Sequence, residues 1–413
     1  MTLSTRNDYK IIAKNFSYLS VMRAINIGFK FFLVAYLIRV LGTQSYGLIT
    51  WLDSIIQFFL MFINFGFNIY AAKYIVDNNH NPKKLNEITS SIYIIKSLLF
   101  LLSLVIVYTI SFTSDFYDYS TIFILFIFCG VGEVLFPVWY FQGKENLKPA
   151  TIIVFISRLL LVLSTLYFVT TNSNTFEYVL ILVLSSFCMG ILGLRYILRN
   201  YKVRLILVSY KRLVAYVKEA IPFFFGRFLA LVFNFGTIYL IGKFCALDDV
   251  AGFDVCLKVI MACIIPFEML QQAVFPTISR TKDKNLLKKL VIASIVFGLI
   301  IAIVVFSFAT NILAVFGGQN TMEYISVLKT LTILAPFVAL TFILGSCSLV
   351  AFGYYREYNI SLIGTSIVYI LAIIILYLFD SLSFWNLIYL RVFGDVLMCF
   401  VRLYYSFKMR IIK

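Results

Sequence analysis

Short polar breaks divide the chain into long apolar runs, each of about 20 residues or more. A helix of that length crosses the hydrocarbon core of a bilayer, whereas the strands of a membrane barrel are short and alternate apolar with polar residues. The pattern therefore predicts an all-α integral membrane protein with twelve transmembrane helices. We expect them at residues 11–40, 47–76, 86–112, 119–142, 149–171, 176–199, 213–244, 250–280, 286–310, 323–352, 357–379 and 384–407.

Lysine and arginine are distributed unevenly between the two sets of connections. Most of the 35 lie at the termini and in the segments that join even-numbered to odd-numbered helices. The opposite turns contain none; these are residues 41–46, 113–119, 171–176, 245–249, 311–322 and 380–383. Cytoplasmic loops of membrane proteins carry an excess of Lys and Arg. Both termini are therefore predicted to be cytoplasmic.

Composition narrows the class of protein. Hydrophobic residues make up 62% of the 413 and charged residues 13%, against about 25% charged in soluble domains. The net charge of +16 would suggest nucleic acid in a soluble protein, but here the membrane topology accounts for it, so no nucleic-acid partner is expected. The polar, basic segment Thr2–Lys10 runs straight into the first helix, and we expect no cleaved signal peptide.

No catalytic, metal or cofactor site is predicted. The connections are too short to hold a catalytic domain, and no Gly-rich, Lys-Ser/Thr nucleotide motif occurs. The seven cysteines are scattered and His80 is the single histidine, whereas metal and disulfide sites need clustered ligands. The chain is therefore not expected to be an enzyme.

The two halves of the chain resemble each other. Arg23 and Arg39 in the first helix have the same separation as Arg227 and Lys243 in the seventh. The ends of helices four and ten also match, as do the starts of helices two and eight; these pairs are Tyr140–Glu145 with Ala351–Glu357, and Tyr46–Gly47 with Ala251–Gly252. Transporters are often internally duplicated. We expect two six-helix lobes, residues 1–205 and 206–413.

Charged side chains occur deep inside the expected helices, where a lipid-facing charge costs about 2.5–3.5 kcal/mol. The deep cations are Arg23, Lys30, Lys96, Arg158, Arg227, Lys258 and Arg391, and the deep acids are Asp53, Glu133, Glu268 and Asp395. Four further cations lie near enough to a helix end to reach the membrane surface; these are Arg39, Lys243, Lys329 and Arg402. The deep charges must face protein partners or water.

Two interpretations of the deep cations remain open. Each could neutralise an acid and hold helices together, which could account for up to four of the seven. Alternatively, they line a cavity between the lobes that binds an anionic headgroup, since Arg forks bind phosphate oxygens bidentately and Lys adds a point charge.

Several segments resemble a known family. They are Arg39-Val-Leu-Gly-Thr-Gln-Ser-Tyr46-Gly47, Asn64-Phe-Gly-Phe67-Asn68, Leu85-Asn-Glu-Ile-Thr-Ser-Ser91 and Trp139-Tyr-Phe-Gln-Gly-Lys144-Glu145. These motifs resemble the O-antigen and polysaccharide flippases of the Wzx type, in the multidrug/oligosaccharidyl-lipid/polysaccharide exporter superfamily. Members often carry an acid before the Phe-Gly-Phe triplet, whereas Asn64 stands there in this chain. If family members use that acid for ion coupling, this chain would need another, and the candidates are the deep acids Asp53, Glu133, Glu268 and Asp395.

The resemblance implies a fold and a cargo. Two six-helix bundles would alternate between cytoplasmic-open and periplasm-open states in the bacterial inner membrane. The cargo would be an undecaprenyl-diphosphate-linked oligosaccharide, the repeat unit of O-antigen or a related polysaccharide. Membrane lipids, a polysaccharide polymerase and a chain-length regulator are the implied partners.

Three other classes fit less well. A multidrug exporter of the same superfamily would need an acidic cavity for cationic drugs. An O-antigen polymerase or ligase needs a long external loop for its catalytic groups. A major-facilitator transporter would carry a Gly-rich loop with Asp and Arg after helix two, and this is absent from Asp77 to Leu85.

Overall fold

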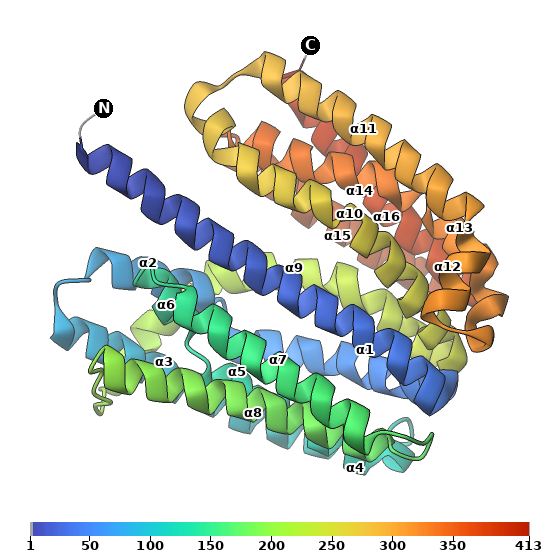
Figure 1. Ribbon diagram of the computed structural model, residues 1–413, viewed down its shortest axis with the longest axis horizontal. Helices are drawn as coiled ribbons and strands as arrows, with labels where there is room; N and C mark the ends of the chain where they lie inside the picture. Colours follow the sequence, from blue (N-terminus) through green and yellow to red (C-terminus); the bar gives the residue numbers. More distant parts are fainter. Residues whose placement is uncertain (1–2, 413) are drawn as a thin grey trace. The chain divides into compact units, whose positions relative to one another are not determined.

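The computed structural model describes the backbone of residues 3–412, and their side chains except those of 3–17, 19, 20, 23, 27, 225–227, 230 and 234. The described backbone forms helices, turns and loops and contains no strand (Figure 1). The prediction of an all-α protein is confirmed. The helices form because the runs are apolar and satisfy their own backbone hydrogen bonds, as a spanning segment in lipid must do.

The chain divides into two compact units. Unit 1 contains Met1–Leu33 and Leu52–Phe228, and unit 2 contains Val34–Trp51 and Leu229–Lys413. Helix α1 (Leu3–Asn64) contributes to both units, and so does α9 (Tyr210–Phe244).

Unit 1 is completed by helices that largely match the predicted ones. They are α2 (Phe67–Asp77), α3 (Pro82–Ile110), η1 (Tyr117–Tyr119), α4 (Ser120–Ile127), α5 (Cys129–Leu135), α6 (Val138–Gly143), α7 (Lys148–Phe168) and α8 (Thr175–Asn200). Helix α8 packs against α5 and α7, and α2 packs against α6 (Figure 1). The core of this unit is rich in aromatic residues and includes the buried side chains of Trp139, Tyr140 and Phe141.

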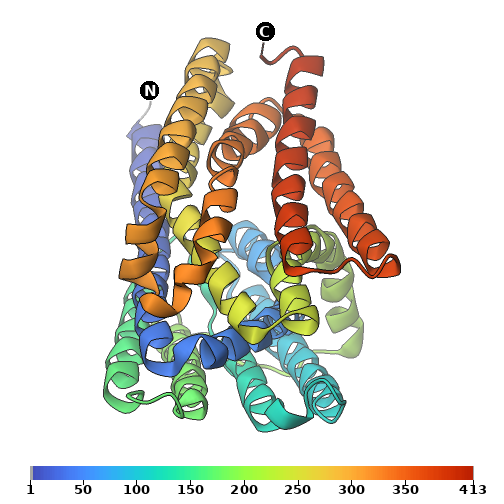
Figure 2. The same ribbon diagram turned by 90° about the vertical axis from the view of Figure 1, so that its right-hand side faces the viewer.

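Unit 2 is likewise built of packed helices. Its further helices are α10 (Leu247–Thr281), α11 (Lys284–Ser307), α12 (Ala309–Phe316), η2 (Gln319–Tyr324), α13 (Ile325–Leu331), α14 (Leu334–Phe342), η3 (Ile343–Val350), α15 (Tyr355–Leu378) and α16 (Phe384–Lys408). Helix α11 packs against α14, and α15 and α16 lie side by side as a hairpin (Figure 2).

Helix ends follow local chemistry. Asn81 accepts a hydrogen bond from the backbone N–H of Lys84 at 3.2 Å, and Pro82 follows at the first helical position of α3. Asp283 caps α11 in the same way, accepting from the N–H groups of Asn285 and Leu286. These side chains mark where α3 and α11 begin.

Four of the predicted helices differ from straight, separate rods. The first two are continuous in α1 except at Gly42, whose φ of 80° and ψ of 170° break the helical path within the predicted 41–46 turn. Predicted helix four is divided into α4, α5 and α6 around Phe128 and Pro137. Predicted helix ten is bent by 52° between Leu331 and Leu334, and it then becomes the π-helix η3.

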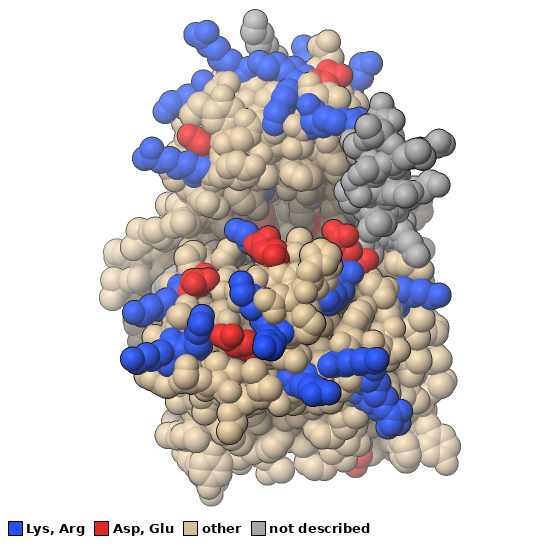
Figure 3. Space-filling view, turned by 90° about the vertical axis from the view of Figure 1, so that its left-hand side faces the viewer, with Lys and Arg blue, Asp and Glu red and all other residues tan. Residues whose placement is uncertain are grey.

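Nine described helices are long and apolar enough to cross a membrane, or ten if the bent pair Gln319–Leu331 and Leu334–Val350 forms one span. Large apolar side chains on several of them are exposed, such as Leu101 and Val105 on α3 and Ile300 and Ile303 on α11. Lysine and arginine side chains gather instead on the face shown in Figure 3. Exposed apolar side chains along the helices, together with a basic face, are typical of a protein embedded in lipid.

Candidate functional site

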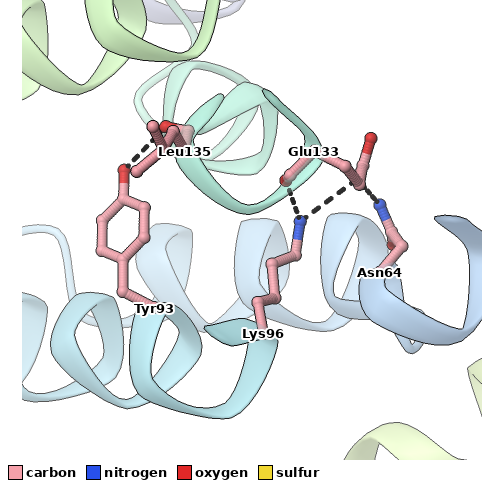
Figure 4. Close-up of polar contacts among 5 residues, drawn as sticks. All are labelled: Asn64, Tyr93, Lys96, Glu133 and Leu135. Carbon is pink, nitrogen blue, oxygen red and sulfur yellow. Dashed lines mark hydrogen bonds and ion pairs between the residues drawn. The ribbon is translucent and has the colours of Figure 1, made fainter. Parts of the chain in front are cut away.

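A buried polar network joins three helices of unit 1. The Nζ atom of Lys96 donates to the carboxylate Oε1 of Glu133 at 3.2 Å and to the backbone oxygen of Glu133 at 3.0 Å (Figure 4). Asn64 donates from Nδ2 to the same carboxylate oxygen. The Lys96 side chain is fully buried, whereas that of Glu133 is 32% exposed. The predicted deep cation and deep acid therefore form a pair.

Pro137 explains why a backbone oxygen takes part. In an uninterrupted helix the carbonyl of residue 133 would accept from the N–H of residue 137, but proline has no N–H. Helix α5 ends at Leu135, and the carbonyl of Glu133 is left to accept from Lys96. Tyr93, one turn before Lys96 on α3, donates its hydroxyl to the carbonyl of Leu135 at 3.3 Å (Figure 4). Two side chains of α3 thus donate to backbone carbonyls at the point where the helix is interrupted.

A second network lies in unit 2, at the motif that begins at Arg39. The Tyr46 hydroxyl donates to Asp254 Oδ2 at 2.5 Å, and Lys258 Nζ donates to the Tyr46 hydroxyl at 2.8 Å. Lys258 and Asp254 also form an ion pair at 2.5 Å within α10. Asp254 is buried, and the predicted set of deep acids does not include it. Its spacing of four residues from Lys258 on one helix face was the signal that could have identified it.

Other side chains of this segment, which is itself part of unit 2, also bond within that unit. Thr43 donates its hydroxyl to the carboxylate of Asp248, and Arg39 donates to the backbone oxygen of Val315. Trp51 donates its indole N–H to the backbone oxygen of Tyr239 at 3.1 Å. Within unit 2 the motif therefore contacts α10 and α12, and Trp51, just beyond the motif, contacts α9.

Arg391 and Asp395 form a third network, inside unit 2. The guanidinium Nε lies 3.0 Å from Asp395 Oδ2, and Nη1 donates to the backbone oxygen of Phe233 on α9. The guanidinium also lies over the Phe233 ring, 5.0 Å from its centroid. Arg391 is 3% exposed, so this cation holds α9 and α16 together.

Arg402 corrects one expectation. Instead of reaching the membrane surface it is buried, donating to the backbone oxygen of Thr341 at 2.9 Å and to Ser361 Oγ at 3.3 Å. Its guanidinium also stacks over the Tyr358 ring. Gly345 makes room for this arrangement, because a Cβ there would lie 2.5 Å from Arg402 Nη1. The π-helix η3 and α16 thus meet around a buried cation.

The other predicted residues occupy separate places. Arg158 donates to Asn26 Oδ1 at 2.8 Å in unit 1, and Lys30 is exposed. Asp53 accepts from Gln57 at 2.8 Å, and Glu268 accepts from Gln272 at 3.2 Å. The side chains of Arg23 and Arg227 lie outside the described residues.

The Trp139–Glu145 motif is a packing interface within unit 1. Its aromatic residues are buried, and a Cβ at Gly143 would lie 2.6 Å from Ile75 on α2. Lys144, just beyond α6, donates to Asn79 Oδ1 at 2.6 Å, and its partial burial lowers the pKa of its ammonium group. The motif therefore fixes α6 against α2. Among the described residues, no group of three or more His, Cys, Asp or Glu side chains could hold a metal ion.

Comparisons with known proteins identify a family for this chain. The family model described as "Polysaccharide biosynthesis protein" matches residues 12–282. A curated relative from Escherichia coli (strain K12), named "Putative O-antigen transporter", is 22% identical over 369 residues, which cover 88% of this chain and 89% of the relative.

Two solved structures share the fold. One is an inward-facing multidrug resistance MATE family transporter of the MOP superfamily, with a TM-score of 0.75 and 13% identity, covering 94% of both chains. The other is the lipid II flippase MurJ in an inward closed conformation, also with a TM-score of 0.75, at 14% identity over 94% of this chain and 87% of MurJ.

Proposed function

This chain belongs to the polysaccharide biosynthesis protein family, and from that premise we propose that it is a flippase for a lipid-linked oligosaccharide. The family match carries the proposal, because it covers most of the chain and agrees with the resemblance found in the sequence. The curated relative is named as a transporter of O-antigen, and the MurJ structure is named as a flippase of lipid II. The protein is a multi-pass transporter of the bacterial inner membrane and not an enzyme.

The proposed cargo is an undecaprenyl-diphosphate-linked repeat unit of O-antigen or a related polysaccharide. Its anionic headgroup would cross between two six-helix lobes, residues 1–205 and 206–413, which alternate in access. A polysaccharide polymerase and a chain-length regulator are the proposed partners. A multidrug exporter remains the alternative, and it requires an acidic rather than a cationic binding site.

Twelve crossings are consistent with the nine candidate spans. The first candidate, Ala24–Asp77, is 54 residues long, and Gly42 divides it into two segments. The bent pair Gln319–Leu331 and Leu334–Val350 adds one crossing, and α9, with 35 residues, adds another. An even number of crossings would place both termini on the same side of the membrane. The basic connections would lie on that side too, which would make it the cytoplasmic one.

The proposed cationic lining consists of the seven deep cations, but they differ in their partners. Lys96, Lys258 and Arg391 already pair with carboxylates. The four others are the first choice for a diphosphate headgroup; these are Arg23, Lys30, Arg158 and Arg227. Coupling to an ion is proposed to involve one of the four predicted acids, of which Asp53 and Glu268 accept hydrogen bonds from glutamine.

Deleting the gene tests the function directly. We expect the undecaprenyl-linked repeat unit to accumulate on the cytoplasmic face and the polymer to disappear from the cell surface. Extraction of labelled lipid-linked sugar, with a surface stain for polysaccharide, measures both. Unchanged surface polysaccharide together with increased sensitivity to cationic drugs would contradict the proposal and favour the multidrug alternative.

Lys30→Ala tests the cationic lining. Because a hydrogen bond to a charged group contributes about 1.5–3 kcal/mol, transport should fall about 10-fold to 100-fold. Membrane abundance should not change, since Lys30 is exposed. Lys83→Ala is the matched control, because Lys83 is an exposed lysine at the start of α3 and should transport normally. Normal transport by Lys30→Ala would remove Lys30 from the lining, and loss of the protein itself would indicate a structural role.

A further inference from the structure

The Lys96 ammonium group donates to two oxygen atoms of different chemical type. It contacts one backbone carbonyl and one carboxylate oxygen, both from Glu133. Carbonyl and carboxylate oxygens are the ligands that proteins offer to hard cations. Irregular backbone in membrane helices exposes such carbonyls where transporters coordinate ions. The break at Pro137 therefore produces the kind of oxygen site that a free cation would occupy.

Asn64 supplies an independent observation at the same place. This residue is 5% exposed, and its Nδ2 donates to the carboxylate oxygen that Lys96 also contacts. Its own Oδ1 atom is buried without a hydrogen-bond partner. Leaving a buried acceptor without a hydrogen-bond partner is unfavourable. The residue that donates to the Glu133 carboxylate thus also carries a buried acceptor that the Lys96 ammonium group does not use.

We propose that Lys96 is a tethered substitute for a bound monovalent cation at this site. Charge supports a monovalent ion: one ammonium neutralises one carboxylate, whereas a divalent ion would leave a net charge inside the membrane. Because the lysine is covalently attached, the site is permanently filled and needs no ion from solution. Removing the side chain without replacing its volume opens a site for Na⁺. The proposal concerns only the network in unit 1 and does not depend on the cargo.

Two substitutions separate charge from space. Lys96→Ala removes the ammonium and leaves room for an ion, whereas Lys96→Met removes the charge but fills nearly the same volume. Purified wild-type protein and both variants are heated in NaCl and in choline chloride at equal ionic strength. The wild type should melt at the same temperature in both salts. Lys96→Ala should melt at a lower temperature in choline and recover by about 3 °C or more in NaCl, with saturation. Lys96→Met should be destabilised equally in both salts.

Further variants identify the ligand and keep the proposal open to contradiction. Adding Glu133→Gln to Lys96→Ala should abolish the recovery, because the amide no longer balances a cation. Equal recovery of Lys96→Met in NaCl would place the ion elsewhere and overturn the proposal, as would a monodisperse Lys96→Ala protein that melts alike in sodium, potassium, lithium and choline. If Lys96→Ala does not fold in any salt, melting of the wild type is followed as NaCl is increased. Saturable stabilisation of the wild type by Na⁺, lost in Glu133→Gln, would show that the site is not already filled and would overturn the proposal.

Discussion

Replacing Gly47 with alanine is expected to prevent correct folding of unit 2. A Cβ atom at Gly47 would lie 1.8 Å from the backbone oxygen of Leu247 and 2.7 Å from its carbonyl carbon. Both are backbone atoms at the start of α10, so no side-chain rotation relieves the clash. Overpacking typically costs about 1–3 kcal/mol, and this contact should cost at least the upper value. The neighbouring bonds from Thr43 and Tyr46 would be displaced together with it.

The measurement is the yield and melting temperature of detergent-solubilised protein on a sizing column. Gly364→Ala is the control, because nothing lies within 4 Å of a Cβ at Gly364 in α15. The control should be at least as stable as the parent, since alanine favours helix more than glycine does. A Gly47→Ala protein that melts like the parent would show that α1 and α10 do not approach so closely.

Arg391→Met is expected to lower the free energy of unfolding by about 3–5 kcal/mol, the usual cost of breaking a buried ion pair on one side. The substitution leaves the carboxylate of Asp395 without its cation and the backbone oxygen of Phe233 without its donor. Because the side chain of Asp395 is only 13% exposed, water cannot easily replace the guanidinium. The loss should appear as a large decrease in melting temperature.

A double-mutant cycle gives this prediction its control. Asp395→Asn alone leaves a buried arginine without its carboxylate, and the double variant Arg391→Met/Asp395→Asn removes both charges. If the pair acts as a unit, the double variant should lose less stability than the sum of the single losses. Arg356→Met, at an exposed arginine, should melt like the parent. Additive losses would contradict the pairing.

The positions of most helices could be predicted from the sequence, because a segment that spans lipid must be a long apolar run that satisfies its own backbone hydrogen bonds. Predicted spans such as 176–199 and 384–407 agree closely with α8 and α16. The interruptions were not predicted. Pro137 was a visible signal inside predicted helix four, whereas the bend after Leu331 and the π-helix η3 depend on packing against neighbouring helices.

The candidate site was only partly predictable, since periodicity shows which charges are deep but not which groups meet them. Lys96 and Glu133 are 37 residues apart, and their contact depends on how α3 meets the broken helix. Asp254 and Lys258 are four residues apart and could have been paired from sequence. Arg402 was expected at the membrane surface because it lies near a helix end, but the missing side chain at Gly345 leaves room for it inside the unit.

The position of Val34–Trp51 in unit 2 has a consequence for biosynthesis. Asp254, the partner of Tyr46, lies 208 residues later in the chain, and domains generally fold as they emerge at about 5–20 residues per second. The hydroxyl groups of Thr43 and Tyr46 are therefore made about 10–40 s before their carboxylate partners. During that interval these hydroxyl groups depend on other hydrogen-bond partners, such as water. The insertion machinery and any membrane chaperone thus meet a segment whose permanent neighbours do not yet exist.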